Sequence, residues 1–216
     1  MAELRNITSK EMKQEIKPQD TSRAHAFELW MSSPMPMVTL VKTFDVTHLL
    51  RFSKRKGLSF NMLMCWCIGK AASQISEFFV LPENGKIYQY DYLAINVIVN
   101  NRKGGISSCD IAFDDDLSQF NKDYISRTQK VSAECKSSFL EDMMVVGTSA
   151  MVQTELDCIV NQYTEKFCNP MVMWGKYRKT WFKTMLPVSF QFHHVQMDGT
   201  QGAKFLARLQ EEMDKM

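Results

Sequence analysis

Two adjacent histidines, His193 and His194, lie near the C-terminal end of the sequence in the stretch HHVQMDG. Histidine is the side chain that most often acts as a general base at neutral pH, because its ordinary pKa lies close to neutrality. A base also needs a fixed tautomer. Asp198, in a turn that ends at Gly199, is placed either to fix the local backbone or to pair with a distant cation. On spacing alone, two histidines that are merely packed or solvated at a strand end fit equally well.

The residues before the histidines alternate in polarity, which is typical of a strand with one buried face. The apolar set is Val188, Phe190 and Phe192, and the polar set is Ser189, Gln191 and His193. Continued alternation places His194 on the apolar side, where burial favours the neutral imidazole that a base requires. Because adjacent strand residues point to opposite faces, a metal site made of His193, His194 and Asp198 is disfavoured.

Hydrophobic periodicity and turn signals predict the elements that must position this turn. Helices are expected at 22–31, 47–56, 59–75, from 117 onward and from 200 to the end, and strands at 37–44, 86–90, 93–99, 143–146, 171–174 and 188–193. Asn84-Gly85 predicts a hairpin turn, and the three aspartates 114–116 are expected to open the helix that follows rather than to bind a metal. This order predicts an α/β (α+β) two-layer sandwich with one large mixed β-sheet and flanking helices.

The composition is that of an ordinary soluble protein, with 45% hydrophobic and 23% charged residues among 216. We expect a polar N-terminal arm over 1–16 and a single domain over 17–216. A formal net charge of +2 gives no strong field, so neither a nucleic acid nor an anionic membrane is implied as partner. Without a secretory signal, a transmembrane run or paired zinc-type spacing, the six cysteines are expected to be free thiols in a reducing cytoplasm.

The stretch HHVQMDG, followed by a short amphipathic helix, resembles the HHxxxDG signature of the chloramphenicol acetyltransferases. Dihydrolipoamide acyltransferases share this signature in related form. Further matches at the expected spacing are Trp174-Gly175-Lys176-Tyr177, Pro187, Gln191, Arg23 with Phe27, and the strand from Met37 to Thr47 with its FDxT-like exit. The resemblance extends over nearly the whole chain from about residue 17, although the middle, 78–142, matches poorly.

This resemblance implies roles for particular residues. His194 is the expected general base, with His193 as its structural neighbour. Asp198 is expected to form a buried ion pair with Arg23 that holds the loop of the base, next to Gly199. Removing one partner of such a pair typically costs about 3–5 kcal/mol.

The resemblance also implies binding residues for the two substrates. Tyr177 matches a position near the coenzyme A tunnel, while Trp30 and Met173 match positions of the acceptor pocket. For Tyr177 and Trp30, plain core packing explains the residue types equally well. No metal is implied.

The sequence departs from the family pattern where the oxyanion of the tetrahedral intermediate is stabilised. Gly147 stands against the family's serine, and Thr148 and Ser149, which follow it, are the alternative hydroxyl donors. Met173 also stands where a substrate-side threonine is usual, and Met151 replaces a tryptophan. These departures keep the thioester chemistry and point away from chloramphenicol as the natural acceptor.

The resemblance implies an enzyme that transfers an acetyl group from acetyl-CoA to a hydroxyl of chloramphenicol or a similar small acceptor. It also implies a cytoplasmic homotrimer with active sites at subunit interfaces. One alternative is a catalytically weak or silent trimeric homologue that binds coenzyme A or another ligand. Another is a dihydrolipoamide acyltransferase-type core, which is disfavoured because no lipoyl domain or flexible linker precedes the core in the sequence.

Overall fold

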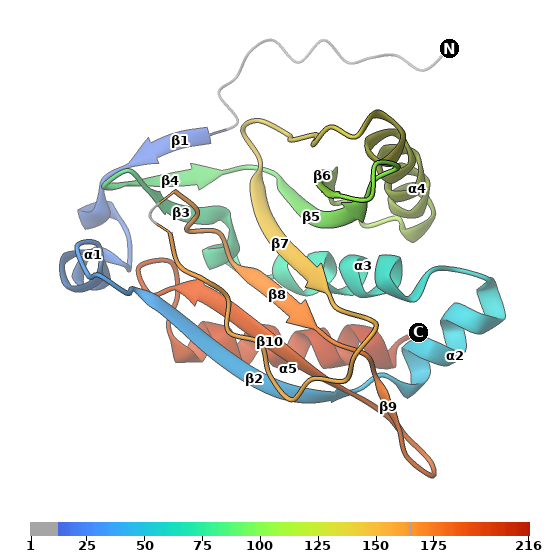
Figure 1. The fold of residues 1–216 in the computed structure, drawn as a ribbon. Coiled ribbons are helices and arrows are strands. Elements are labelled where there is room, and N and C mark those ends of the chain that lie inside the picture. Colours follow the sequence, from blue (N-terminus) through green and yellow to red (C-terminus); the bar gives the residue numbers. More distant parts are fainter. Residues whose placement is uncertain (1–12, 165) are drawn as a thin grey trace.

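The computed structural model describes residues 13–164 and 166–216. Its main feature is a large mixed sheet with the strand order β2-β10-β8-β7-β5-β6, in which β9 also pairs with β10 (Figure 1). The strands are β2 Met37–Asp45, β5 Leu93–Asn100, β6 Ile106–Ala112, β7 Met144–Ala150, β8 Met171–Trp174, β9 Arg178–Lys179 and β10 Thr184–His193. β7 runs parallel to β5 and β8, and the other pairs are antiparallel.

The second layer consists of helices, of which α3 and α5 lie against one face of the sheet (Figure 1). The helices are α1 Ala24–Trp30, α2 Thr47–Lys56, α3 Phe60–Ala72, α4 Leu117–Glu134 and α5 Gly199–Asp214, with 3-10 turns at Pro18–Asp20 and Ser76–Phe79. A small antiparallel sheet joins β1 Lys13–Ile16, β4 Lys86–Tyr90 and β3 Val80–Glu83. The expected mixed α/β architecture with one large sheet and flanking helices is confirmed.

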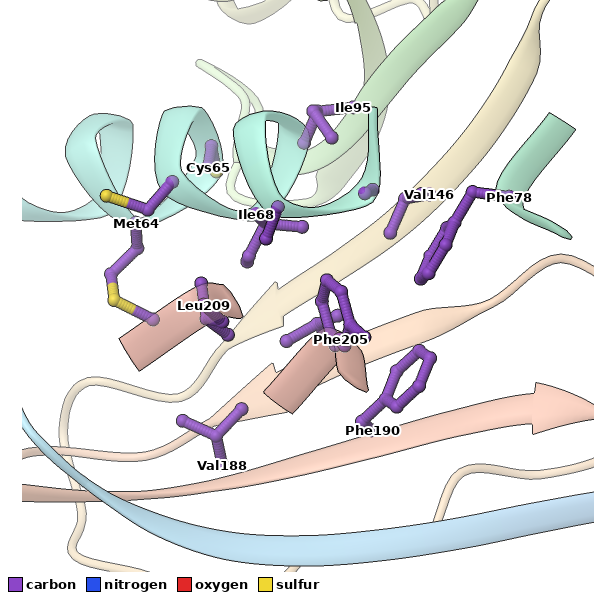
Figure 2. Packing of buried hydrophobic residues seen from close by; sticks show 14 of the residues in the cluster. Met64, Cys65, Ile68, Phe78, Ile95, Val146, Val188, Phe190, Phe205 and Leu209 are labelled. Atoms are coloured by element: carbon purple, nitrogen blue, oxygen red, sulfur yellow. The ribbon is translucent and has the colours of Figure 1, made fainter. Parts of the chain in front are cut away.

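The core lies between the sheet and helices α3 and α5, and Figure 2 shows its central part. Phe205 of α5 packs on Phe190 of β10 and on Phe78, with ring centroids 4.4 and 5.0 Å apart. Ile68 of α3 and Val146 of β7 belong to the same buried cluster. Since full burial of such a side chain stabilises the fold by roughly 1.5–3 kcal/mol, this layer holds the strand that leads into the histidine pair.

The polypeptide segments 151–164 and 166–170 cross the opposite face of the sheet (Figure 1). Ile159 donates its backbone N–H to Ser189 Oγ at 2.8 Å, and Gln191 Nε2 donates to the carbonyl of Asn161 at 3.2 Å. Ser189 and Gln191 belong to the polar set that the alternation pattern placed away from the core. Their side chains therefore contact the first of these segments and not open solvent.

Several local predictions are confirmed by side-chain and backbone geometry. Asp116 caps α4 by accepting the N–H of Ser118, as expected for the aspartate triplet. Gly57 ends α2 at a φ of 65°. Asn84 and Gly85 have φ of 49° and 78° and join β3 to β4 in the expected hairpin.

Other elements differ from the expectation. Residues 13–16, assigned to the polar arm, form β1, whereas residues 1–12 of that arm lie outside the described part of the chain. Strand β6 was not predicted because its polar residue Asp110 breaks the apolar pattern. This carboxylate is buried and accepts hydrogen bonds from Asn96 Nδ2 at 2.6 Å and from the N–H of Leu140 at 2.9 Å. The division of the chain into an arm and one domain stays a prediction.

Candidate active site

His194 lies in the turn between β10 and α5, one residue after the strand ends. Its ring stacks on the indole of Trp30, with centroids 4.8 Å apart and ring planes within 4° of parallel. Its backbone N–H donates to the carbonyl of Pro36 at 2.8 Å. The expectation that alternation carries His194 into the apolar core is wrong, because the strand ends at His193 and the half-buried imidazole packs on α1.

His193 occupies the buried position beside it, with 1% of its surface exposed. Its Nδ1 accepts the backbone N–H of Val195 at 3.1 Å, an arrangement that requires this nitrogen to be unprotonated. Burial, and to a lesser extent the neighbouring His194, lower the pKa of His193 to about 4. His193 is therefore neutral at physiological pH and acts as a fixed acceptor within the turn.

Arg23, at the start of α1, stabilises this turn by hydrogen bonds from its side chain. Its guanidinium donates to the carbonyl of His194 at 2.7 Å, to the carbonyl of Val195 at 2.9 Å, and to Asp198 Oδ2 at 3.3 Å. The arginine side chain is 10% exposed and the Asp198 side chain 41% exposed. The expected ion pair is present, but only its arginine is buried, and of the three bonds made by the guanidinium only the one to the Val195 carbonyl is fully buried.

Asp198 connects the turn to helix α5. Its Oδ1 accepts the N–H of Thr200 at 2.9 Å, while its own N–H donates to Gln201 Oε1, which completes a capping box. Burial alone would raise the pKa of Asp198, but hydrogen bonds from the Thr200 backbone and from Arg23 hold that pKa below its ordinary value. The Asp-x-x-Gln spacing is a recognised capping signature, so this contact was readable in the sequence.

The tautomer of His194 is not fixed by a hydrogen bond within the described residues. Its Nδ1 is buried and has no hydrogen-bond partner there. The plane of the ring is instead defined by the stack on Trp30. Sequence reasoning did not assign a role to the Pro36 carbonyl, whose only signal was the pair of prolines before β2.

The three residues considered for oxyanion stabilisation lie on β7 and point to different faces. Thr148 is buried on the helix side, where its hydroxyl donates to the carbonyl of Asn96 at 2.7 Å and lies 3.8 Å from Cys65 Sγ. Its proton is therefore already engaged. Gly147 and half-buried Ser149 occupy the alternate positions of the strand, which face the other side of the sheet.

The side chain of Met171, the residue of β8 that pairs with Gly147, fills the space beside this glycine. A Cβ built on Gly147 would lie 2.0 Å from Met171 Sδ, whereas its backbone φ is not in the left-handed region. Met173, two residues along β8, is almost fully buried, so its side chain does not line an open pocket within this chain. Met171 Sδ therefore occupies the space that a side chain on Gly147 would need, while the backbone conformation itself permits another residue.

Tyr177 lies far from His194 within the chain. It directly precedes β9, which pairs with the Thr184 end of β10, whereas His194 follows the other end of that ten-residue strand. At 3.2–3.4 Å per residue, β10 separates them by about 30 Å. Tyr177 lines a recess of about 300 Å³ with Phe60, against which its ring packs edge-on at 5.5 Å, and with exposed Lys176.

Apart from the candidates on β7 and β8, the geometry places the expected site residues in two groups. Arg23, Trp30, His193, His194 and Asp198 form the turn beside α1. Tyr177 lies with its recess at the far end of β10. Among the described residues, no group of three or more His, Cys, Asp or Glu side chains is arranged to hold a metal ion, and none of the helices is long and apolar enough to span a bilayer.

Comparison with known proteins supplies the family. The model of the chloramphenicol acetyltransferase family matches residues 14–210. The chain belongs to this family. It is 24% identical to chloramphenicol acetyltransferase 3 of Escherichia coli over 80% of this chain and 84% of that protein. It is 23% identical to a chloramphenicol acetyltransferase of Bacillus pumilus, with 87% of each chain covered.

Solved structures agree on the fold. A chloramphenicol acetyltransferase superposes with a TM-score of 0.80 at 16% identity, covering 94% of this chain and 100% of the other. A probable dihydrolipoamide acetyltransferase from Listeria monocytogenes superposes with a TM-score of 0.69 at 13% identity, covering 94% of each chain. Family membership makes this protein an acyltransferase of the chloramphenicol acetyltransferase type.

Burial of His193 leads to a prediction about stability. Because its folded-state pKa is about 4 and its ordinary value is 6.5, the unfolded chain takes up the proton first as the pH falls. The stabilisation is therefore complete above about pH 6.5 and is lost between pH 6.5 and pH 4. Urea unfolding across this window should show a shallower loss for His193→Gln than for wild type. His25→Gln, which alters an exposed histidine, should keep the wild-type slope.

Proposed function

We propose that this protein transfers an acetyl group from acetyl-CoA to a hydroxyl of chloramphenicol or a similar small acceptor, with His194 as the general base. The observation that carries this proposal is the placement of the His194 ring. It stacks on Trp30, while the backbone of His194 is held on both sides by Pro36 and Arg23. A half-buried imidazole held in this way is suited to meet an acceptor hydroxyl in one orientation.

The reaction follows from the chemistry of a base and a thioester. The unprotonated His194 nitrogen takes the acceptor's proton while the acceptor oxygen attacks the thioester carbonyl. The tetrahedral intermediate then breaks its carbon–sulfur bond, releasing the acetyl ester. The departing thiolate takes the proton back from the imidazolium, so that no group on the enzyme is consumed.

The recess around Tyr177 fits one part of acetyl-CoA. Its walls combine the rings of Phe60, Tyr177 and Trp174 with exposed Lys176. Aromatic walls suit the thin pantetheine arm, and an ammonium group suits a phosphate. These features support acetyl-CoA as the acyl donor.

The separation of the two groups supports a homotrimer with shared sites. Since about 30 Å of strand lies between Tyr177 and His194 in one chain, the recess of one subunit has to approach the base of another. Leu29, Met35 and Val41, near the base turn and the free edge of β2, are exposed and apolar. Such a patch supports burial against a neighbouring copy.

The trimer is tested by its mass. Light scattering at micromolar concentration should give about three times the 25.0 kDa of one chain. Replacing Val41 and Leu29 with Lys should dissociate the assembly and abolish turnover together. A monomeric wild-type protein with full activity would contradict the shared site.

The reaction itself is tested by following free thiol from acetyl-CoA, with chloramphenicol present or absent. Thiol release that requires chloramphenicol supports the proposed transfer. Transfer to dihydrolipoamide leaves the total number of free thiols unchanged, so with this acceptor the free CoA itself is separated by chromatography and measured. CoA formation only with dihydrolipoamide would indicate a dihydrolipoamide acyltransferase-type core. No release with either acceptor, despite binding of acetyl-CoA, would indicate a silent ligand-binding homologue.

The Gly147 position yields a separate prediction, which rests on the position of Met171 Sδ beside it. We expect Gly147→Ser to lower the free energy of unfolding by an amount at the low end of the roughly 1–3 kcal/mol typical of overpacking, because the new Cβ meets Met171 Sδ, which lies near the flexible end of its side chain. Combining it with Met171→Ala provides room for the hydroxyl. If an oxyanion donor is missing, the double variant should show a higher kcat than Met171→Ala alone, by up to about 10²-fold, at unchanged KM. A Gly147→Ser protein with wild-type stability would refute the steric explanation.

A further inference from the structure

The turn between β9 and β10 presents two large aromatic side chains to solvent. Trp181 is 95% exposed and Phe182 is 85% exposed, more than any other large hydrophobic residue in the described part of the chain. Figure 1 shows this hairpin extending beyond the body of the protein. We call Trp181 and Phe182 the aromatic tip.

The aromatic tip rests on a closed turn. Thr180 donates its backbone N–H and its hydroxyl to the carbonyl of Lys183, at 2.8 and 3.0 Å, and its Oγ accepts the N–H of Lys183 at 3.2 Å. This turn fixes the two residues between them at the apex, pointing away from the fold. Their exposure is therefore a property of the hairpin geometry.

The surroundings of the aromatic tip are positively charged. Helix α2 and the segment 178–184 together contain seven Lys or Arg residues and no Asp or Glu. Arg178 and Lys183 are partly neutralised by ion pairs with Glu155, Asp157 and Asp45. Within the described residues, the exposed side chains of Arg51, Lys54 and Lys179 have no carboxylate within 4.0 Å.

The cations and the aromatic tip lie next to one another. A shallow groove of about 220 Å³ is lined by residues of both segments. Its lining includes Arg51, Lys54, Lys179, Trp181 and Phe182. The net charge of +2 for the whole chain averages over this arrangement, so the overall charge did not indicate an anionic surface as partner.

We propose that the aromatic tip and the cations around it dock the protein on an anionic lipid surface. Aromatic side chains gain free energy at the boundary between headgroups and acyl chains, and nearby Lys and Arg are attracted by anionic headgroups. Insertion of Trp181 and Phe182 would remove from water the apolar surface that the fold leaves exposed.

A lipid surface fits this shape better than a protein partner does. A specific protein interface buries about 1,000 Å² or more around a desolvated apolar centre. The aromatic tip offers two side chains on a narrow hairpin, with exposed cations on its flank. A fluid surface can enclose such a protrusion without a matching pocket, and the turn of His194 lies at the opposite end of β10.

The test is sedimentation of the intact protein with vesicles of phosphatidylcholine alone or mixed with phosphatidylglycerol. Wild type should bind only the mixed vesicles, more weakly as salt is raised. Trp181→Ser/Phe182→Ser should bind at least about tenfold more weakly. Phe139→Ser/Ile106→Ser, which alters exposed apolar residues elsewhere, should bind as wild type does.

A charge series tests the contribution of the cations, and the aromatic variant separates insertion from simple adsorption. Arg51→Gln/Lys54→Gln/Lys179→Gln should lose vesicle binding, whereas Lys122→Gln/Lys130→Gln/Lys136→Gln, around α4, should retain it. Full binding by the Trp181→Ser/Phe182→Ser variant would overturn the proposal, since adsorption would then be electrostatic only. It would equally be overturned if wild type ignored both kinds of vesicle, or if it bound soluble poly-glutamate and no lipid.

Discussion

Replacing His194 with Ala is expected to lower kcat for acetyl transfer by about 10²–10⁴-fold, because a positioned base contributes that much and nothing nearby can replace it. His193, the adjacent imidazole, has its Nδ1 engaged by the N–H of Val195, and burial lowers its pKa. The KM for acetyl-CoA should change little, since the substitution leaves the residues that line the Tyr177 recess unchanged. The measurement is thiol release from acetyl-CoA by the purified variant.

The matched control is His193→Ala, which should lower kcat less than His194→Ala while reducing thermal stability more. This order is expected because His193 is the more buried of the two and accepts a backbone hydrogen bond. A His194→Ala protein that kept more than about a tenth of wild-type turnover would show that the base lies elsewhere. So would a His193→Ala variant that lost as much turnover without unfolding.

Patterns among residues that are close in the sequence were sufficient to predict much of the fold. The alternation of Val188, Phe190 and Phe192 marked β10, and the buried face of α5 followed from helical spacing. Strand β6 was missed because it contains a buried aspartate, Asp110. Its carboxylate accepts hydrogen bonds from Asn96 and Leu140, which come from other parts of the chain. Such long-range pairing removes the cost of a buried charge, but it leaves no periodic signal.

The same difference between local patterns and long-range contacts decides which parts of the candidate site could be predicted. The motif singled out His194, and the family resemblance linked Arg23 to Asp198, 175 positions away. Neither gave the stack on Trp30 or the carbonyl of Pro36, since both depend on how α1 and the loop before β2 meet the turn. Gly147 was recognised as a departure from the family. The position of Met171 Sδ beside it, on the neighbouring strand, could be found only from the sheet register.

Arg23→Met is expected to damage both stability and turnover, because it removes every donor that Arg23 supplies to the turn of the base. The carbonyls of His194 and Val195 would lose these hydrogen bonds. A buried group left unpaired costs about 1–3 kcal/mol, which applies in full to the Val195 carbonyl, whereas the bond to the His194 carbonyl is only partly buried. The Asp198 carboxylate contributes less, since it is 41% exposed and water can replace the guanidinium. The decrease in the free energy of unfolding should be measurable by urea titration.

The effect of Arg23→Met on the reaction should appear in kcat, because the turn that carries His194 loses two of its backbone anchors and a displacement of about 1 Å can cost 10²-fold in rate. Arg23→Lys tests whether charge alone suffices. A lysine supplies the positive charge but not the planar fork that serves two carbonyls and a carboxylate, so it should restore little. Asp198→Asn keeps an oxygen for capping α5 and should be the mildest of the three. If Arg23→Lys recovered wild-type kcat, the ion pair with Asp198 would be the essential contact, and the carbonyl bonds would be incidental.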